Sequence, residues 1–497
     1  MFDIQEAKDD LLKAATYLAQ KITSSEGRSE AITQIVPFYL EMNQIETAVE
    51  LANKIIDPFV KDQILLRIAE KCASMDKDNY ALELSQMIED DSLYLQALEQ
   101  IAFQKIKLGQ VEKAMQIAEM LSHPDSIYSA LVSYLAEKGK NKQQISEIIN
   151  KICFPTIKAF SLQNVSLIFA KNDKEKAIEF LEKALEAAFE IDYKIDEIKI
   201  LIDIAEAFHV LQLTDKAIET LEKAKREAEK LDDLDRENLL SSISVAFLKN
   251  GSIELADEAL DFIEDKTLIA STLVGFSDVF LKNQENTEAA EALEEALQIL
   301  RSQTESEIRS TLMRNHALTL VAVRFANLTE IEKAILAAET INDDQEQKAA
   351  FSEMAKVLAL RQEDELAEQI TKMIPYELNR AETFINLFDI KTSLGQSEKA
   401  TRFLKLAADS VDFIPQHSLQ VRACCDLAER FIECGEIEEG IKFAKQALQM
   451  SLKMRNEALR VVCLGYVANV YRKNNLTLSE EEKNLLYEIL FRAETST

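Results

Sequence analysis

Glycine and proline are scarce in this chain, whose 497 residues include 9 Gly, 6 Pro and no Trp. Gly and Pro punctuate turns, strand edges and long loops, so a protein rich in sheet or loop needs more of them. The hydrophobic fraction of 47% is still enough for a core, and the charged fraction of 29% suits the solvent faces of helices. The composition therefore predicts an all-α protein.

The patterns that usually carry chemistry are also missing. The six cysteines form no C-x-x-C pair, the four histidines share no HxxxH or HExxH spacing, and no glycine-rich phosphate loop occurs. We expect no catalytic residue, cofactor or metal. Acidic clusters at 232–235 and 342–344 leave an all-α enzyme as a disfavoured alternative, because both lie at unit junctions where Asp caps the next helix.

Long apolar runs are missing as well, and the charge is one-sided. No stretch reaches 18 uncharged apolar residues and the N-terminus is acidic, which predicts a cytoplasmic protein without membrane insertion. The net charge of -30 repels phosphate backbones, so it disfavours nucleic acid and favours a basic or amphipathic protein partner at the acidic body.

One segment, residues 441–473, is basic, with seven Lys and Arg against one acidic residue. It could dock an acidic partner or the acidic body of a second copy, giving self-association through this end. The alternative is an ordinary solvated helix face. The patch we expect consists of Lys453, Arg455, Arg460, Arg472 and Lys473.

A repeated pattern organises most of the chain. A small residue, usually Ala, recurs twelve times at the start of a helical pattern, with spacings near 33 or near 40 residues. Apolar, small and aromatic residues precede this anchor at helical spacing, which predicts a first helix. A Gly, Asn or Asp is common five residues before the anchor, where it can end that helix in a turn. Each repeat is therefore predicted to be a helix–turn–helix. The anchors are Ala48, Ala81, Ala114, Ile145, Ala177, Ala217, Ala256, Ala289, Ala334, Ala367, Ala400 and Gly440.

The two spacings have a cause in the second helix of each unit. Seven residues after the anchor, units followed by a short spacing carry Ile or Leu, as at Ile55, and then a helix stop. The other five units carry Ala there, as at Ala184, and their second helices continue. Seven residues are about two helical turns, so the insertion lengthens the helix pair without rotating its apolar face.

These helix pairs resemble tetratricopeptide repeats from about residue 27 to 450, although the family's Trp-x-x-Leu-Gly start is missing. The resemblance implies an α-solenoid, a right-handed superhelix of about twelve helix-turn-helix repeats of 33 and 40 residues with terminal capping helices. We expect an N-terminal capping helix (1–26), a first array (27–303), a second array continuous with it (304–452) and C-terminal capping helices (453–497). The stretch 304–328 is the one place where a bend would fit.

The resemblance also implies where a ligand would bind. The first helices would line a concave groove, so the function we expect is a non-enzymatic protein–protein interaction scaffold that holds a partner peptide or helix there. A peptide or small-ligand sensor arm of a regulatory system is the alternative. The groove candidates are Lys199, Glu206, His209, Asn238, Asp278, His316, Lys356, Glu382, Asp389, Arg422 and Glu429.

Overall fold

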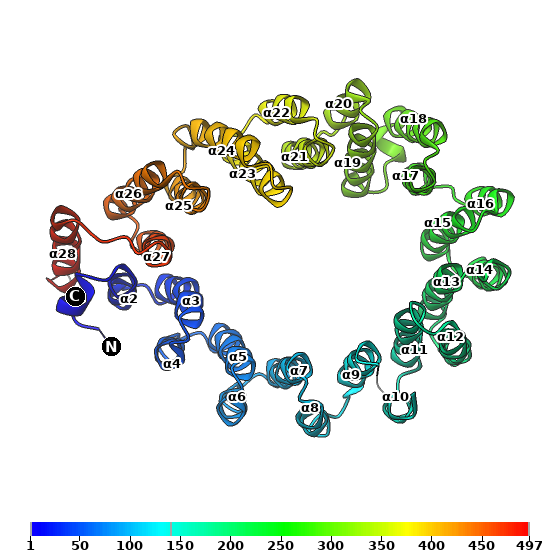
Figure 1. The fold of residues 1–497 in the computed structure, drawn as a ribbon, viewed down its shortest axis with the longest axis horizontal. Helices are drawn as coiled ribbons and strands as arrows, with labels where there is room; N and C mark the ends of the chain where they lie inside the picture. The colour runs from blue at the N-terminus through cyan, green and yellow to red at the C-terminus, as the bar shows by residue number, and fades with distance from the viewer. Residues whose placement is uncertain (1, 140–141, 496–497) are drawn as a thin grey trace. The chain divides into compact units, whose positions relative to one another are not determined.

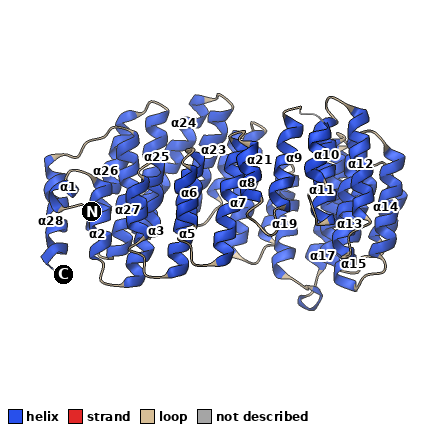
Figure 2. Cartoon of the chain, turned by 90° about the horizontal axis from the view of Figure 1, so that it is seen from below, coloured by secondary structure: helices blue, strands red, loops and turns tan. Residues whose placement is uncertain are grey.

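The computed structural model describes residues 2–139 and 142–495, and every regular element in these ranges is a helix (Figure 2). The prediction of an all-α helical-repeat fold is confirmed. None of the described helices is long and apolar enough to cross a membrane. The chain divides into two compact units, unit 1 (residues 1–104 and 351–497) and unit 2 (residues 105–350), and each is described by itself.

Unit 2 consists of helix pairs and one short 3-10 helix. It begins within α7 (Asp91–Lys107) and ends within α21 (Asp344–Leu360). Between them lie α8 (Val111–Ala118), α9 (Asp125–Glu137), α10 (Lys142–Ile149), α11 (Pro155–Phe169), α12 (Lys174–Ala188), α13 (Lys194–Val210), α14 (Thr214–Ala228), α15 (Asp233–Lys249), α16 (Ile253–Leu260), α17 (Lys266–Lys282), α18 (Asn286–Ser302), η1 (Glu305–Glu307), α19 (Thr311–Asn327) and α20 (Ile331–Glu339).

Unit 1 contains both ends of the chain. Its helices are α1 (Ile4–Ala7), α2 (Leu11–Lys21), α3 (Ser25–Glu41), α4 (Ile45–Ala52), α5 (Pro58–Ser74), α6 (Asp78–Ser85), α22 (Asp364–Lys372), α23 (Glu377–Ser393), α24 (Ser397–Val411), α25 (His417–Glu433), α26 (Ile437–Lys453), α27 (Glu457–Lys473) and α28 (Glu480–Thr495). The N-terminal capping helix expected within residues 1–26 is broken into α1 and α2, because the Asp10 side chain accepts hydrogen bonds from the backbone amides of Leu12 and Lys13.

The helices alternate in role along both units, as Figure 1 shows. Odd-numbered helices from α3 to α25 are the first helices, and each even-numbered helix from α4 to α26 is the second helix of its pair and carries one anchor. All twelve anchors are buried. At Gly440 an added Cβ would lie 2.9 Å from the carbonyl oxygen of Ala428 in α25, which shows how closely the paired backbones approach.

Second-helix lengths agree with the two spacing classes. In the seven repeats that are followed by a short anchor spacing, the second helix has 8 or 9 residues. In the other five repeats it is longer, with 15 residues in α12, α14 and α24 and 17 residues in α18 and α26. The apolar residue at Ile55 closes the short α4, while Ala184 lies fully buried inside the longer α12. Anchor spacing therefore reports the length of the second helix.

A left-handed residue five positions before the anchor makes the turn in most pairs. Asn43 (φ 56°) is one example, and the Gln44 amide then donates to the Tyr39 carbonyl at 2.9 Å, the bond of a Schellman motif. Gln212, Thr329 and Gln362 adopt the same conformation although their side chains do not favour it. Before the anchor Ala289 the left-handed residue is Gln284 (φ 67°), whereas Asn283 has a right-handed conformation (φ -82°).

The two ends of the chain pack against each other within unit 1. Helix α27 contacts α25 on one side and α3 on the other, so the row of first helices continues from the C-terminal part of the chain into the N-terminal part. Helix α2 packs on α27, in the place that a second helix takes in the other pairs, and α28 packs on α1 and α2. The N-terminal helices α1 and α2 thus pack against the C-terminal helices α27 and α28.

Candidate functional site

The eleven groove candidates all lie on first helices, from α13 to α25. Most are exposed, and His209, Lys356 and Glu429 are half-buried. In unit 2 the candidates lie on α13, α15, α17 and α19, and in unit 1 on α21, α23 and α25. The predicted register therefore places polar side chains on the accessible face of the first helices.

Several of these candidates bridge adjacent repeats. The Asp278 carboxylate on α17 accepts two hydrogen bonds from Arg324 on α19, at 3.0 and 2.9 Å. Asp389 on α23 binds Arg430 on α25 in the same bidentate way, at 3.0 and 2.8 Å. Bidentate guanidinium–carboxylate pairs fix geometry as well as charge, so both pairs set the spacing of neighbouring first helices.

Other candidates take part in weaker links of the same kind. Glu206 pairs with Lys249 at 2.8 Å, and Glu429 pairs with Lys473 at 3.2 Å. A hydrogen bond of 3.1 Å joins His209 Nδ1 to the Asn250 side chain. Half-exposed pairs contribute about 0–1 kcal/mol each, so their main effect is on the register between repeats. Among the other candidates, Lys356 pairs with Glu353 on its own helix, and His316, Glu382 and Arg422 are exposed.

Two candidates, Lys199 on α13 and Asn238 on α15, line a hollow between their helices with a volume of about 400 Å³. Two carboxylates, Asp203 and Asp235, line it as well. The other lining residues are Ile195, Ile202, Leu239 and Ser242. The hollow therefore offers aliphatic surface, an amide and a net negative charge on the first-helix face of unit 2.

Electrostatics at this hollow favour a cation. Desolvation raises the pKa of Asp203 above its ordinary value, and the nearby charge of Glu206 raises it further. A carboxylate in this state gains more from an approaching positive charge than one in bulk water does. The arrangement can bind a basic group beside an aliphatic one.

Two buried acidic residues that the repeat pattern did not reveal contact the loop that leads to the next repeat. Asp62 on α5 accepts hydrogen bonds from the backbone amides of Glu89 and Asp90 at 3.0 and 2.9 Å, and Glu237 on α15 accepts one from Asp265 at 3.1 Å. Each acid lies 19 residues before its anchor, a signal that alignment on the anchors can find. These residues are structural, because their oxygens face the connecting loop of the following repeat.

The basic segment is largely engaged within its own chain. Arg460 donates to the carbonyl oxygen of Met454, and Arg472 lies 3.6 Å from Glu41 of α3. Lys473 pairs with Glu429, as described above, while Lys453 and Arg455 are exposed. Part of the patch therefore meets acidic groups of its own unit rather than a separate molecule.

Comparison with known proteins connects the repeat pattern to a family. Residues 169–190, which cover the end of α11, the turn and all of α12, match the family model described as "Tetratricopeptide repeat". No curated protein matches the chain.

Several solved structures give partial matches. The quorum sensor NprR from B. thuringiensis is 15% identical over 70% of this chain and 97% of its own, with a TM-score of 0.27. Aspartyl phosphate phosphatase F from Bacillus subtilis is 16% identical over 87% and 96%, with a TM-score of 0.27. A circular tandem repeat protein is 15% identical over 97% of both chains, with a TM-score of 0.17. Scores this low carry no argument about function.

The repeated helix pairs and the match at α12 define the class. The chain is a helical-repeat protein whose helix pairs are similar to tetratricopeptide repeats. Its matched segment contains the anchor Ala177 and Ala184 seven residues later, both fully buried, so the family match agrees with the register derived from the sequence.

Proposed function

We propose that the protein is a non-enzymatic scaffold that binds an extended, basic or amphipathic segment of a partner protein on the first-helix face of unit 2. The observation that carries this proposal is the hollow between α13 and α15, where Asp203 and Asp235 lie beside aliphatic side chains. A lysine or arginine of the partner pairs with these carboxylates, and a neighbouring apolar side chain covers Ile195 and Ile202. Lys199 and Asn238 orient the partner's main chain.

The inter-repeat pairs support the same proposal from another direction. Because Asp278 and Glu206 already bind cations of the next repeat, the first helices of unit 2 are held at a set spacing before a partner arrives. A preorganised surface loses less conformational entropy on binding than a mobile one does.

Binding of a fluorescein-labelled (Lys-Leu)5 peptide, measured by anisotropy, tests the proposal. We expect saturable binding that weakens at high salt, and about tenfold weaker binding to the double variant Asp203→Asn and Asp235→Asn, a loss typical of removed charge pairs. Asp257→Asn with Asp261→Asn, on and just after the second helix α16, is the matched control, because both residues are exposed away from the hollow.

Two results would contradict the proposal. One is equal binding of a (Glu-Leu)5 peptide, and the other is an equal loss of binding in the control variant. A further expected result concerns pH: protonation of Asp203 removes its charge, so binding weakens as the pH falls through its raised pKa.

A further inference from the structure

A second cavity lies where the chain ends meet in unit 1. Its volume is about 520 Å³, within the range of small-molecule sites. It is lined by the connection between α1 and α2, by α3, by α27 and by the segment that joins α27 to α28. We call it the chain-end pocket.

Tyr471 of α27 is the feature that sets the chain-end pocket apart. Its side chain is only 6% exposed, and among the described residues its hydroxyl has no hydrogen-bond partner. Tyr39, a buried tyrosine of α3, instead shares a 2.7 Å hydrogen bond with Thr16. An unsatisfied buried hydroxyl costs about 1–3 kcal/mol, so a ligand that supplies an acceptor regains that free energy.

The protonation state of Tyr471 determines whether its hydroxyl can donate a hydrogen bond to a ligand. Desolvation raises its pKa well above the ordinary value, and the charge of Glu482 adds to this effect. The hydroxyl therefore keeps its proton at neutral pH and is available as a donor.

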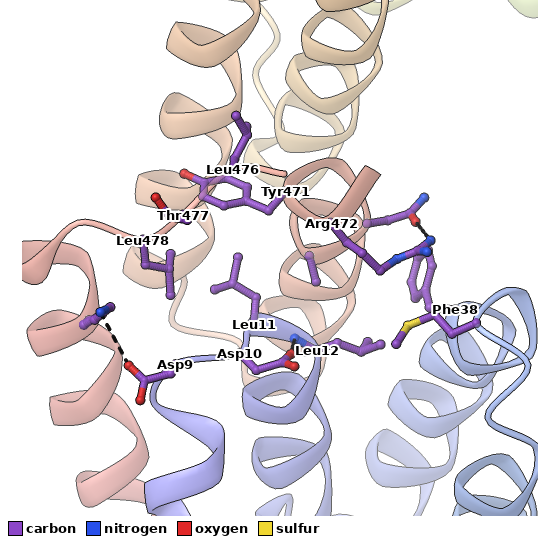
Figure 3. Close-up of a pocket in the computed structure, with 14 residues that line it drawn as sticks. Asp9, Asp10, Leu11, Leu12, Phe38, Tyr471, Arg472, Leu476, Thr477 and Leu478 are labelled. Atoms are coloured by element: carbon purple, nitrogen blue, oxygen red, sulfur yellow. Dashed lines mark hydrogen bonds and ion pairs between the residues drawn. The ribbon is translucent and has the colours of Figure 1, made fainter. Parts of the chain in front are cut away.

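The rest of the lining combines aliphatic surface with charges of both signs. Figure 3 shows the Leu11 and Leu478 side chains below the Tyr471 ring, and Arg472 near Phe38. The Lys483 ammonium lies 3.7 Å from the carboxylate of Asp9 and 3.0 Å from that of Glu480 on its own helix, so its pair with Asp9 is the looser of the two. Arg472 donates to Asn469 at 2.7 Å on the same helix.

We propose that the chain-end pocket binds a small zwitterion with an aliphatic body, of the amino-acid or short-peptide class, and that its carbonyl or carboxylate oxygen accepts the hydrogen bond of Tyr471. The aliphatic body contacts Leu11 and Leu478. The ammonium group approaches Asp9, while a terminal carboxylate approaches Lys483 or Arg472.

Binding at this position has a consequence for the fold. The lining comes from both ends of the chain, so a ligand can occupy the complete pocket only while α27 and α2 are packed together. A ligand that binds the joined state alone stabilises it in proportion to its concentration over its Kd. The pocket therefore links a small molecule to the closure of the chain ends, independently of the hollow in unit 2.

The test uses the full chain and leucine, Leu-Leu and Leu-Leu-Leu as probes, with binding measured by calorimetry. We expect at least one probe to bind, and N-acetyl-leucine and leucinamide, which each lack one charge, to bind more weakly than leucine. Tyr471→Phe should weaken binding about five- to tenfold, as expected for one hydrogen bond. The same variant without ligand should melt no lower than the parent protein, because the hydroxyl it loses has no partner.

Tyr466→Phe is the matched control, since it removes a hydroxyl from the same helix outside the pocket lining. Its probe affinity should equal that of the parent protein. Failure of all three probes to bind at millimolar concentration would overturn the assigned ligand class. Binding that Tyr471→Phe leaves unchanged would overturn the role of the hydroxyl.

Discussion

Gly465 on α27 offers a direct test of the packing between the chain ends. A Cβ added there would lie 2.8 Å from Phe38 Cε2 and 3.4 Å from Ile35 Cγ2 of α3, whereas ordinary carbon contacts are about 3.5–4.0 Å. Gly465→Leu therefore overpacks this contact, at a cost of about 1–3 kcal/mol. Leucine is the better helix former by almost 1 kcal/mol, so any destabilisation must come from the packing.

The assay is hydrogen exchange of α2, which packs on α27 but lies at the opposite end of the sequence. A loss of 1–3 kcal/mol corresponds to amide exchange about five to 150 times faster in α2. Gly275→Leu is the control, because its Cβ would lie 2.6 Å from Val245, again between adjacent first helices, but in unit 2. If α2 exchanges at the parent rate in Gly465→Leu, the ends do not pack as the structure shows.

Three further outcomes are expected. Ala217→Phe overpacks the fully buried anchor between α13 and α14, so it should lower the free energy of local opening, measured by hydrogen exchange, by about 1–3 kcal/mol. Phe at the exposed Glu219 should change this free energy little. Lys391→Met should lower the free energy of local opening of α21–α23, measured by hydrogen exchange, by about 1–3 kcal/mol. The reason is that this 0%-exposed lysine donates a hydrogen bond to the Ala359 carbonyl oxygen at 2.7 Å. Carboxyl NMR should give Glu307 a pKa of about 2, owing to hydrogen bonds from Lys266 and from the Thr304 backbone and hydroxyl; its stabilising effect is then present above its ordinary pKa of 4.5 and lost as the pH falls towards 2.

Much of the fold could be predicted because residue types within each repeat determine where its helices begin and end. The small anchors and the Ile or Ala seven residues later determine whether a second helix stops or continues, as Ile55 and Ala184 show. Turn residues were less predictable. Gln212 and Thr329 adopt positive φ because the packing of the two helices requires a tight turn, and tertiary contacts outweigh the local preference.

The exposure of the groove candidates was predictable from the sequence, but their pairing was not. The anchors placed Asp278 and Asp389 on the accessible face, but nothing within one repeat indicates which side chain of the next repeat will reach them. Such pairs depend on the distance and rotation between neighbouring repeats. The packing of α2 on α27 was also unpredictable, because helices so far apart in the sequence share no local signal.

The packing of α27 against α2 and α3 determines which contacts must break when this part of unit 1 unfolds locally. In an open stack the terminal repeat has one neighbour and unfolds first, because stability is a sum of repeat and neighbour terms. Helix α27 has α25 on one side and α3 on the other, so opening here must break the contacts of α27 with α3 and with α2 together. The ion pair between Lys21 and Glu494 at this junction is half-exposed, and such pairs contribute little.

Apolar contacts such as that of Gly465 with Phe38 should therefore hold the junction closed. Raising the salt concentration to 1 M, where the Debye length is about 3 Å, should leave hydrogen exchange in α2 unchanged, whereas Gly465→Leu should accelerate it at any salt concentration. Faster exchange of α2 in the parent protein at 1 M salt would instead assign the closure to its ion pairs.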